Sequence, residues 1–397
     1  MTTFGRPSLP LWPLDPAVTY LNHGTVGVTP LAVLAEQRRI RDDLERRPSQ
    51  FLLRELSEIR FGTGGGEKPR LRRAADVVAA FLGASGDDFV FVDNITTGAN
   101  AALASLPLAP GDEIVALELG YGGIHAAARH AARRRGATLR LVALPEPVRD
   151  ADEVVAAFSA ALAPATKLAV IDHVTSGSAL VLPIERLCAA CRERGITTLV
   201  DGAHAPGAIA LDLPSIGADV YVANLHKWAW TPRSLGFLWT SPAARAALHS
   251  PVVSWGLDQG LTAEFDWPGT RDPTAALAAP AAVALQEAIG VERIRAWNHQ
   301  LAWASARRLA EHWGVPFETP ESMIGTMATI RLPEALGSTR EQAVALRDRL
   351  LFEHAIEVHL GAWKERLQLR ISAQIYNEPA DYERLADAVE REIRGTR

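Results

Sequence analysis

The most constraining feature of the sequence is a series of short apolar segments that alternate with helical stretches between residues 89 and 240. Most of these segments are apolar at every position, which is typical of strands covered on both faces. Alternating strand and helix units predict an α/β fold with a mostly parallel sheet. The predicted strands begin near residues 89, 113, 139, 168, 197, 220 and 236.

The pattern changes after Pro280, where a long helical stretch precedes a region with fewer strands. We therefore expect an N-terminal arm (1–30), a large α/β domain (31–279) and a small α+β domain (280–397), on which the N-terminal segment can also pack. The predicted strands of the small domain begin near 327, 356 and 366. Helices are predicted over 31–47, 71–82, 280–312, 339–354 and 379–394, and a glycine-rich loop over 62–69.

Charge and cysteine content narrow the function classes. Acidic and basic residues are mixed along the chain and the net charge is −5, which predicts no nucleic-acid partner. No apolar run is long enough to span a membrane, and the N-terminus lacks the pattern of a signal peptide. The two cysteines, Cys188 and Cys191, lie within a predicted helix, so we expect packing residues, no metal site and a cytoplasmic protein.

Polar side chains follow several of the predicted strands, where ligands bind in sheets of this kind. Thr96 and Thr97 begin a helix and would offer N–H groups to an anion, although an ordinary helix cap has the same pattern. Asp201 ends an apolar strand, where a buried carboxylate needs a cation as partner; a solvated loop is the alternative. Asp172 and His173 end another strand, and such a histidine suits a structural hydrogen bond as well as catalysis.

Lys227 ends the strand that begins at residue 220, and His226, Trp228 and Trp230 surround it in the sequence. Burial among these rings would lower its pKa and favour Schiff-base chemistry. A lysine whose stem lies over an aromatic surface is the alternative. Asp201 precedes Lys227 by 26 residues, and an anion site at 96–98 would lie at the same sheet edge. The spacing therefore predicts one cleft.

Together with other motifs, these segments resemble the class V aminotransferases, pyridoxal 5′-phosphate (PLP) enzymes of fold type I. Within that family the isopenicillin N epimerase-like branch is the most similar. The resemblance runs from residue 21 to 377 and implies a homodimer with shared active sites. The motifs that carry it are LNHGTVG, FLLREL, NITTGANA, DHVTSGSALVLP, VDGAHAPG, HKW, SWG, WPGTRDPTA and LRISAQIYN.

The resemblance also implies roles for individual residues. Lys227 would form the Schiff base with PLP, Asp201 would pair with the pyridine nitrogen, and His204 would act beside them near the ring hydroxyl. Arg370 would bind the substrate carboxylate, because a guanidinium group matches a carboxylate with two hydrogen bonds. The remaining contacts would be His173 near the ring hydroxyl, Tyr121 stacked on the ring, Thr96, Thr97, Asn224 and His226 at the phosphate, Thr270 from the neighbouring subunit, and Asn22 and His23 on the substrate side.

One position departs from the family pattern. Members of the family often carry a small residue before the His–Lys pair, whereas this chain has Leu225. We expect this larger side chain to reshape the wall of the site, which weakens the epimerase assignment and leaves the PLP assignment intact.

The reaction is less constrained than the cofactor. We expect Lys227 to remove the Cα proton of an amino acid, with β-elimination from an S-substituted cysteine in secondary metabolism as the first hypothesis. Epimerisation needs a second acid, for which Tyr121 and His125 are candidates. An aminotransferase or a decarboxylation-linked deaminase stays open. A cysteine desulfurase would need a nucleophilic cysteine in the C-terminal part.

Two other classes fit the sequence less well. A non-catalytic protein of this fold would be expected to lose Lys227, Asp201 or Arg370, and all three are present. A nucleotide-binding Rossmann enzyme would carry GxGxxG after its first strand, and this chain does not.

Overall fold

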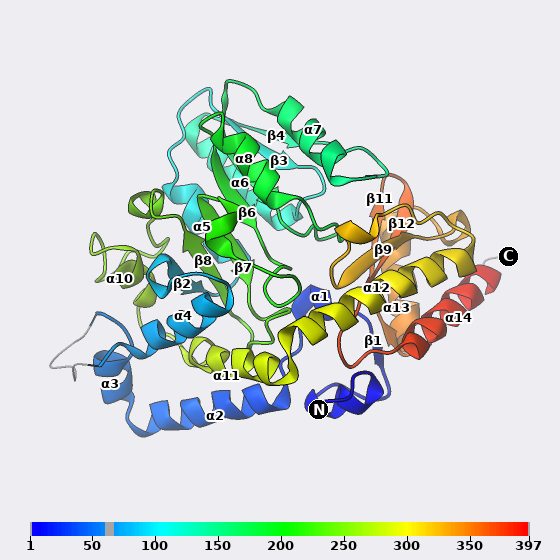
Figure 1. Ribbon diagram of the computed structural model, residues 1–397, viewed down its shortest axis with the longest axis horizontal. Coiled ribbons are helices and arrows are strands. Elements are labelled where there is room, and N and C mark those ends of the chain that lie inside the picture. Colours follow the sequence, from blue (N-terminus) through cyan, green and yellow to red (C-terminus); the bar gives the residue numbers. More distant parts are fainter. Residues whose placement is uncertain (1, 60–66, 396–397) are drawn as a thin grey trace.

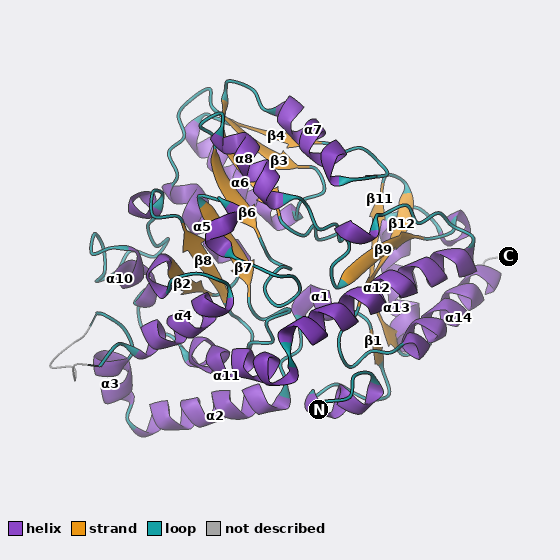
Figure 2. Cartoon of the chain, in the orientation of Figure 1, coloured by secondary structure: helices purple, strands orange, loops and turns teal. Residues whose placement is uncertain are grey.

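A seven-stranded sheet forms the centre of the large domain (Figures 1 and 2). This computed structural model describes residues 2–59 and 67–395, so most of the loop expected at 62–69 lies outside the described residues. The strand order is β2-β8-β7-β6-β5-β3-β4; β3 to β7 pair in parallel, and β8 and β2 add an antiparallel edge. All seven predicted strands are confirmed: β2 (Phe89–Val92), β3 (Glu113–Leu117), β4 (Thr138–Val142), β5 (Thr166–Asp172), β6 (Thr197–Asp201), β7 (Val220–Asn224) and β8 (Gly236–Thr240).

Helices cover both faces of this sheet, which explains why most of its strands are largely apolar. Successive side chains of a strand face opposite sides, so Phe89 and Phe91 join one core and Val90 and Val92 join the other. The core containing Phe89 includes α4 (Arg70–Phe81), α7 (Ala151–Ala161), α8 (Ile184–Arg192) and α11 (Thr274–Ile289). The core containing Val90 includes α5 (Ile95–Ser105), α6 (Gly122–Arg135) and α10 (Leu261–Asp266). Shorter helices are α1 (His23–Val26), α3 (Pro48–Gln50) and α9 (Leu213–Ile216), and α2 (Leu31–Arg46) packs on α11.

The small domain is built on a three-stranded antiparallel sheet of order β11-β12-β9. One face of this sheet is apolar and forms a second core. Its strands are β9 (Met327–Arg331), β11 (His359–Trp363) and β12 (Arg366–Ser372), and its helices are α12 (Val291–Trp313), α13 (Arg340–Phe352) and α14 (Pro379–Gly395).

The helix expected over 280–312 is two helices instead. Helix α11 begins at Thr274 and packs on α2 and α4 of the large domain. Gly290, with φ +103°, separates it from α12, and the two helices are bent by 77°. A boundary at residue 280 therefore falls inside α11. In the described part of the chain no single helix is long and apolar enough to cross a membrane; only this bent pair, taken together, meets that test.

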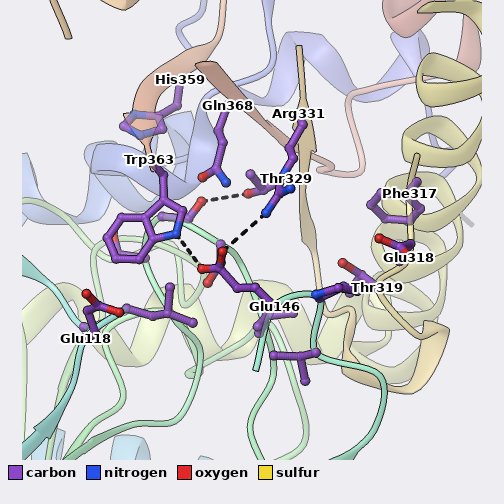
Figure 3. A pocket seen from close by; sticks show the side chains of 18 of the residues that line it. Glu118, Glu146, Phe317, Glu318, Thr319, Thr329, Arg331, His359, Trp363 and Gln368 are labelled. Atoms are coloured by element: carbon purple, nitrogen blue, oxygen red, sulfur yellow. Dashed lines mark hydrogen bonds and ion pairs between the residues drawn. The ribbon is translucent and has the colours of Figure 1, made fainter. Parts of the chain in front are cut away.

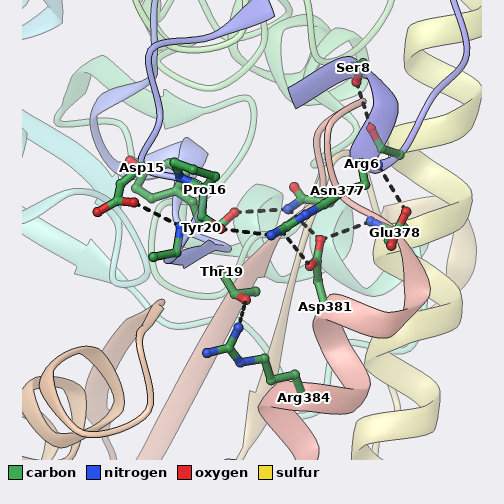
Figure 4. Close-up of polar contacts among 12 residues, drawn as sticks. Arg6, Ser8, Asp15, Pro16, Thr19, Tyr20, Asn377, Glu378, Asp381 and Arg384 are labelled. Atoms are coloured by element: carbon green, nitrogen blue, oxygen red, sulfur yellow. Dashed lines mark hydrogen bonds and ion pairs between the residues drawn. The ribbon is translucent and has the colours of Figure 1, made fainter. Parts of the chain in front are cut away.

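The N-terminal arm packs on the small domain, as Figure 4 shows. Ser8 Oγ donates to Ile375 O at 2.7 Å, Asn377 Nδ2 donates to Tyr20 O at 3.1 Å, and β1 (Thr19–Tyr20) pairs in parallel with β10 (Ile356–Glu357). The arm then continues into α1, which lies between the two sheets (Figure 1). Residues from both chain termini therefore stabilise one unit.

A buried ion pair connects three elements of the large domain. Arg72 of α4 and Asp266 of α10 form two hydrogen bonds of 2.6 and 2.7 Å, with both side chains almost inaccessible to water. Arg72 also donates to the carbonyl oxygens of Gly86 and Phe89, at the start of β2. Burial raises the pKa of Asp266 although Arg72 opposes this shift, so the carboxylate depends on its partner.

We predict that Arg72→Met lowers the free energy of unfolding by about 3–5 kcal/mol, because it leaves the Asp266 carboxylate buried without a cation. Chemical denaturation would measure this, with Arg73→Met, which removes an exposed pair with Glu67, as the matched control expected to change stability by less than ~0.5 kcal/mol. The double variant Arg72→Met/Asp266→Leu should recover part of the loss. An equal loss of stability in Arg72→Met and Arg73→Met would contradict the prediction.

Candidate active site

Eight of the residues expected at the site line one cavity of about 340 Å³ at the carboxyl ends of β5, β6 and β7. The large domain, the small domain and the N-terminal arm all contribute to its walls. The eight expected residues are Thr96, Tyr121, Asp201, His204, Asn224, His226, Lys227 and Arg370. Residues that line it without an expected role include Thr25, Asp172, Ser176 and His359.

Lys227 lies at the centre of this cavity. Its Nζ lies 3.2 Å from His204 Nε2. Burial lowers the pKa of Lys227 to about 7, and the nearby charge of Arg370 acts in the same direction. An amine with this pKa is largely neutral just above pH 7, and the neutral form is the nucleophile and the base.

Two buried carboxylates lie side by side at the same edge. Asp172 ends β5 and Asp201 ends β6, and the two are register partners in the parallel pairing. Burial raises the pKa of Asp201 to about 6, while a hydrogen bond from Ala203 N opposes the shift. Burial and the charge of Asp201 raise the pKa of Asp172. Burial therefore opposes ionisation of both carboxyl groups, and a cation placed beside them would favour it.

His204 is buried and its Nδ1 has no hydrogen-bond partner among the described residues. Burial, followed by the charge of Lys227, lowers the pKa of His204, so the imidazole is neutral. His173 does not line the cavity, contrary to the expectation of a place near the ring hydroxyl. Its Nδ1 lies 2.9 Å from the hydroxyl of Tyr221, within the core, because the side chain following Asp172 points to the other face of the sheet.

The turn after β2 forms a polar end of the cavity. Asn94 caps α5 and accepts a hydrogen bond from Thr97 N, and Asn224 Oδ1 accepts from Ile95 N at 2.9 Å. These contacts hold the first turn of α5 beside His226, whose Nδ1 donates to Leu235 O. The first turn of a helix favours an anion. Thr96 faces this end, whereas Thr97 contributes to the cap and does not line the cavity.

Leu225 does not reshape the wall of the site, which corrects the expectation from the sequence. Asn224 and His226 line the cavity, whereas Leu225, between them, is fully buried in the apolar core. The large residue at this position is therefore no argument about the reaction.

Arg370 is a buried cation without a carboxylate partner in the part of the chain that the structure describes. Its guanidinium group donates to Ser176 O at 2.5 Å and to Thr25 Oγ1 at 2.8 Å, while Nε has no partner. Burial lowers its pKa to about 10, so it stays charged at neutral pH. An unpaired buried charge is costly, and this cost favours binding of a substrate carboxylate.

The N-terminal arm contacts the backbone of Lys227 through a side chain that lies outside the cavity. His23 does not line the cavity; its Nε2 lies 3.0 Å from Lys227 O and its Nδ1 lies 2.9 Å from the Tyr376 hydroxyl. Asn22 donates to Glu357 and is likewise absent from the wall. Gly24, Thr25 and Val26 replace them on the substrate side. The expectation for Asn22 and His23 therefore identified the right segment and the wrong side chains.

A few contributors were missed by sequence reasoning. His359 is the register partner of Arg370 in the small sheet. Its place at the site could have been inferred from the sequence only through this pairing, because Arg370 was expected to bind the substrate. Burial, followed by the charge of Arg370, lowers the pKa of His359 to about 3. The local sequence around Thr25 does not predict a place at the site, because its contact with Arg370 joins residues 345 apart in the chain.

Two further candidates are placed away from the cavity. His125 Nε2 donates to Leu117 O at 2.8 Å and does not line the cavity. Thr270 is exposed after α10 and does not line the cavity of its own chain.

Comparison with known proteins agrees with this geometry. The family model described as aminotransferase class V matches residues 67–385. The chain is 34% identical to a putative L-cysteine desulfhydrase of Oryza sativa subsp. japonica, over 95% of this chain and 83% of that protein. It is also 34% identical to an isopenicillin N epimerase of Amycolatopsis lactamdurans, over 95% of both chains.

Solved structures show the same fold. A cysteine desulfurase from Thermococcus onnurineus NA1 superposes with a TM-score of 0.78 at 19% identity, covering 100% of this chain and 99% of that chain. A cystine C–S lyase in complex with cysteine persulfide gives a TM-score of 0.75 at 21% identity, covering 94% and 97%. At this identity the likeness describes the fold alone.

We predict that Asp201→Asn stabilises the cofactor-free protein at neutral pH. A folded-state pKa near 6, above the ordinary value of 3.8, means that the folded protein binds more protons than the unfolded chain between these values, so stability falls as pH rises through this window. Asparagine carries no charge and can still accept from Ala203 N. Thermal unfolding should therefore show a melting temperature a few degrees higher at about pH 7.5 and a smaller difference at about pH 4.5.

The control for this variant is Asp87→Asn, since Asp87 is exposed and its replacement should leave the pH dependence unchanged. A melting temperature of Asp201→Asn that is lower than that of the wild type at about pH 7.5 would disprove the electrostatic cost.

Proposed function

The chain belongs to the class V aminotransferase family of PLP-dependent enzymes, and from this we propose that it is a lyase that eliminates the β-substituent of an S-substituted cysteine. The observation that carries the proposal is a site with one well-placed base, Lys227, in a chain similar along 95% of its length to a putative L-cysteine desulfhydrase.

The residues present fit PLP. The cavity joins a lysine of lowered pKa, a pair of buried carboxylates short of a cation, and a helix start that favours an anion. Tyr121, 48% exposed, presents an aromatic ring at the cavity wall. A protonated pyridine nitrogen supplies the missing cation, a phosphate group suits the helix start, and a planar ring suits Tyr121.

PLP supplies a carbonyl group that condenses with amines and a ring that withdraws electrons from Cα. Lys227 would hold it covalently, Asp201 would pair with its nitrogen, and Tyr121 would stack on it. Thr96, Asn224 and His226 would surround its phosphate. His204, neutral and with a free Nδ1, would provide a hydrogen bond at the ring.

The residues of the chain also organise the substrate. Arg370 would bind the α-carboxylate with the donors that now contact Ser176 and Thr25. The neutral amine of Lys227 would then take the Cα proton. The sulfur leaves with the electrons of the Cβ–S bond, and hydrolysis of the remaining fragment releases pyruvate and ammonia.

One of the two candidates for the second acid of an epimerase is poorly placed. Epimerisation needs a second acid, and His125 is occupied by a backbone carbonyl outside the cavity, which leaves the Tyr121 phenol. The similarity to an isopenicillin N epimerase keeps this alternative in view. Transfer of sulfur to a cysteine is unsupported, because Cys188 and Cys191 are buried in α8 and burial raises the pKa of both thiols to about 12.

The family resemblance further supports a homodimer. Several apolar side chains of the segment before α10 are exposed: Val252, Val253, Trp255 and Leu257. Thr270 is exposed shortly after α10. We propose that this region covers the partner subunit and that Thr270 contacts the phosphate bound there.

We predict that the cofactor-free protein takes up PLP faster as pH rises through about 7, the pKa of Lys227, and that the rate levels off above it. The increase in visible absorbance of the covalent adduct would measure this rate. Lys227→Ala should form no such adduct, while Lys167→Ala, at an exposed lysine, should behave as the wild type. A rate independent of pH would contradict the lowered pKa.

The reaction itself is tested with PLP-loaded enzyme, L-cysteine and S-substituted cysteines in deuterated water. We expect equal amounts of pyruvate and of the released sulfide or thiol, and Lys227→Ala should lower the rate by at least ~10³-fold. Deuterium at Cα of an inverted amino acid without thiol release would instead identify an epimerase.

A further inference from the structure

A second cavity, of about 380 Å³, adjoins the active-site cavity and shares Tyr121, Ser176 and His359 with it. We call it the outer cavity; its other walls include Glu118, Glu146, Phe317 and Trp363 (Figure 3). It lies between the large domain and the small sheet. None of the reaction steps described above uses it.

One face of the small sheet forms a continuous wall for both cavities. Register pairs His359 with Arg370, Arg370 with Thr329, and Gln368 with Arg331. Residues two apart on a strand share a face, so Arg370 and Gln368 point to the same side. The opposite face is apolar and buried. A substrate whose carboxylate binds Arg370 is thereby placed at the start of a wall that continues into the outer cavity.

The geometry points to the outer cavity as the subsite for the distal part of the substrate side chain. This inference rests on the proposed function and specifies its substrate: a cysteine whose sulfur carries a substituent several atoms long that has an apolar part and is neutral or cationic. The cysteine side chain has only Cβ and Sγ, whereas a cavity of this volume falls in the range of sites for much larger ligands.

The chemistry of the walls determines the type of substituent. Trp363 Nε1 donates to Glu146 Oε1 at 2.6 Å, and Glu146 also pairs with Arg331 and with Lys364 (Figure 3). These bonds hold the indole ring of Trp363 in one orientation, so that it offers a flat apolar surface in a cavity that Phe317 also lines. An aromatic or alkyl group that packs on such a surface leaves water.

Acidic residues outnumber basic ones along this wall. Glu118, Glu146 and Glu318 line the outer cavity, and Arg331 is the basic residue among its described lining. Lys364 lies beside them, 3.2 Å from Glu146 and 3.9 Å from Glu118. The three carboxylates Glu118, Glu146 and Glu318 face two cations, Arg331 and Lys364, which leaves an excess of one negative charge. A substituent that carries a negative charge is therefore disfavoured in the outer cavity.

The test uses PLP-loaded enzyme and four probes in two pairs. S-benzyl- and S-methyl-L-cysteine differ in apolar size, and S-(2-aminoethyl)- and S-carboxymethyl-L-cysteine differ in charge at similar length. We expect Trp363→Ala to lower the benzyl-to-methyl ratio of kcat/KM roughly tenfold. Glu118→Gln should lower the aminoethyl-to-carboxymethyl ratio. Phe352→Ala, at an exposed position on α13, is the control for which both ratios should stay constant.

Binding of the same probes, followed by the change in visible absorbance, separates this inference from the lyase assignment. Ratios of Kd that shift in the two variants support the subsite even if no thiol is released, in which case the lyase assignment alone fails. Thiol release with ratios that neither variant changes would overturn the subsite and leave the lyase intact. Circular dichroism of each variant would verify that the fold is retained.

Discussion

Water-excluded charges at the carboxyl edge of the large sheet are the constraint on which the rest of the structure depends. One cavity is lined by Asp172, Asp201, Lys227 and Arg370. Burial favours the neutral form of each, because it raises the pKa of the two aspartates and lowers the pKa of Lys227 and Arg370. Such an arrangement is unfavourable for folding and favourable for binding. A ligand with a cationic ring nitrogen, an electrophilic carbon and a carboxylate relieves all of these costs together.

The position of these groups requires three separate parts of the chain. The large sheet supplies Asp201 and Lys227, the small sheet supplies Arg370, and the arm supplies Thr25, which binds Arg370, and His23, which contacts the carbonyl oxygen of Lys227. Gly27 allows this close approach, because a Cβ there would lie 1.9 Å from His226 O. Any movement of the small domain together with the arm would therefore displace Arg370 and the contact that His23 makes with Lys227.

Much of the fold and about half of the site followed from local pattern. The strands of the large sheet were predictable because most of them are largely apolar. Asp201 and Asn224 were predictable because they end such strands, and Lys227 because it follows one closely. The division at 280 was misplaced because an alanine-rich helix gives no signal of which domain it packs on. His173 and Leu225 were misplaced because side-chain direction alternates, and one residue decides whether a group faces the cavity or the core.

The sequence by itself determined the class of fold and the positions of the lysine and the aspartate that we propose hold the cofactor, since these depend on residue type and on position near a strand end. Only the tertiary structure decided which side chains face the substrate. Arg370 meets Thr25 and Ser176 across separations of 345 and 194 residues, and the outer cavity exists only where two domains meet. Contacts of this range leave no periodic pattern along the chain, because they arise from how separate elements pack.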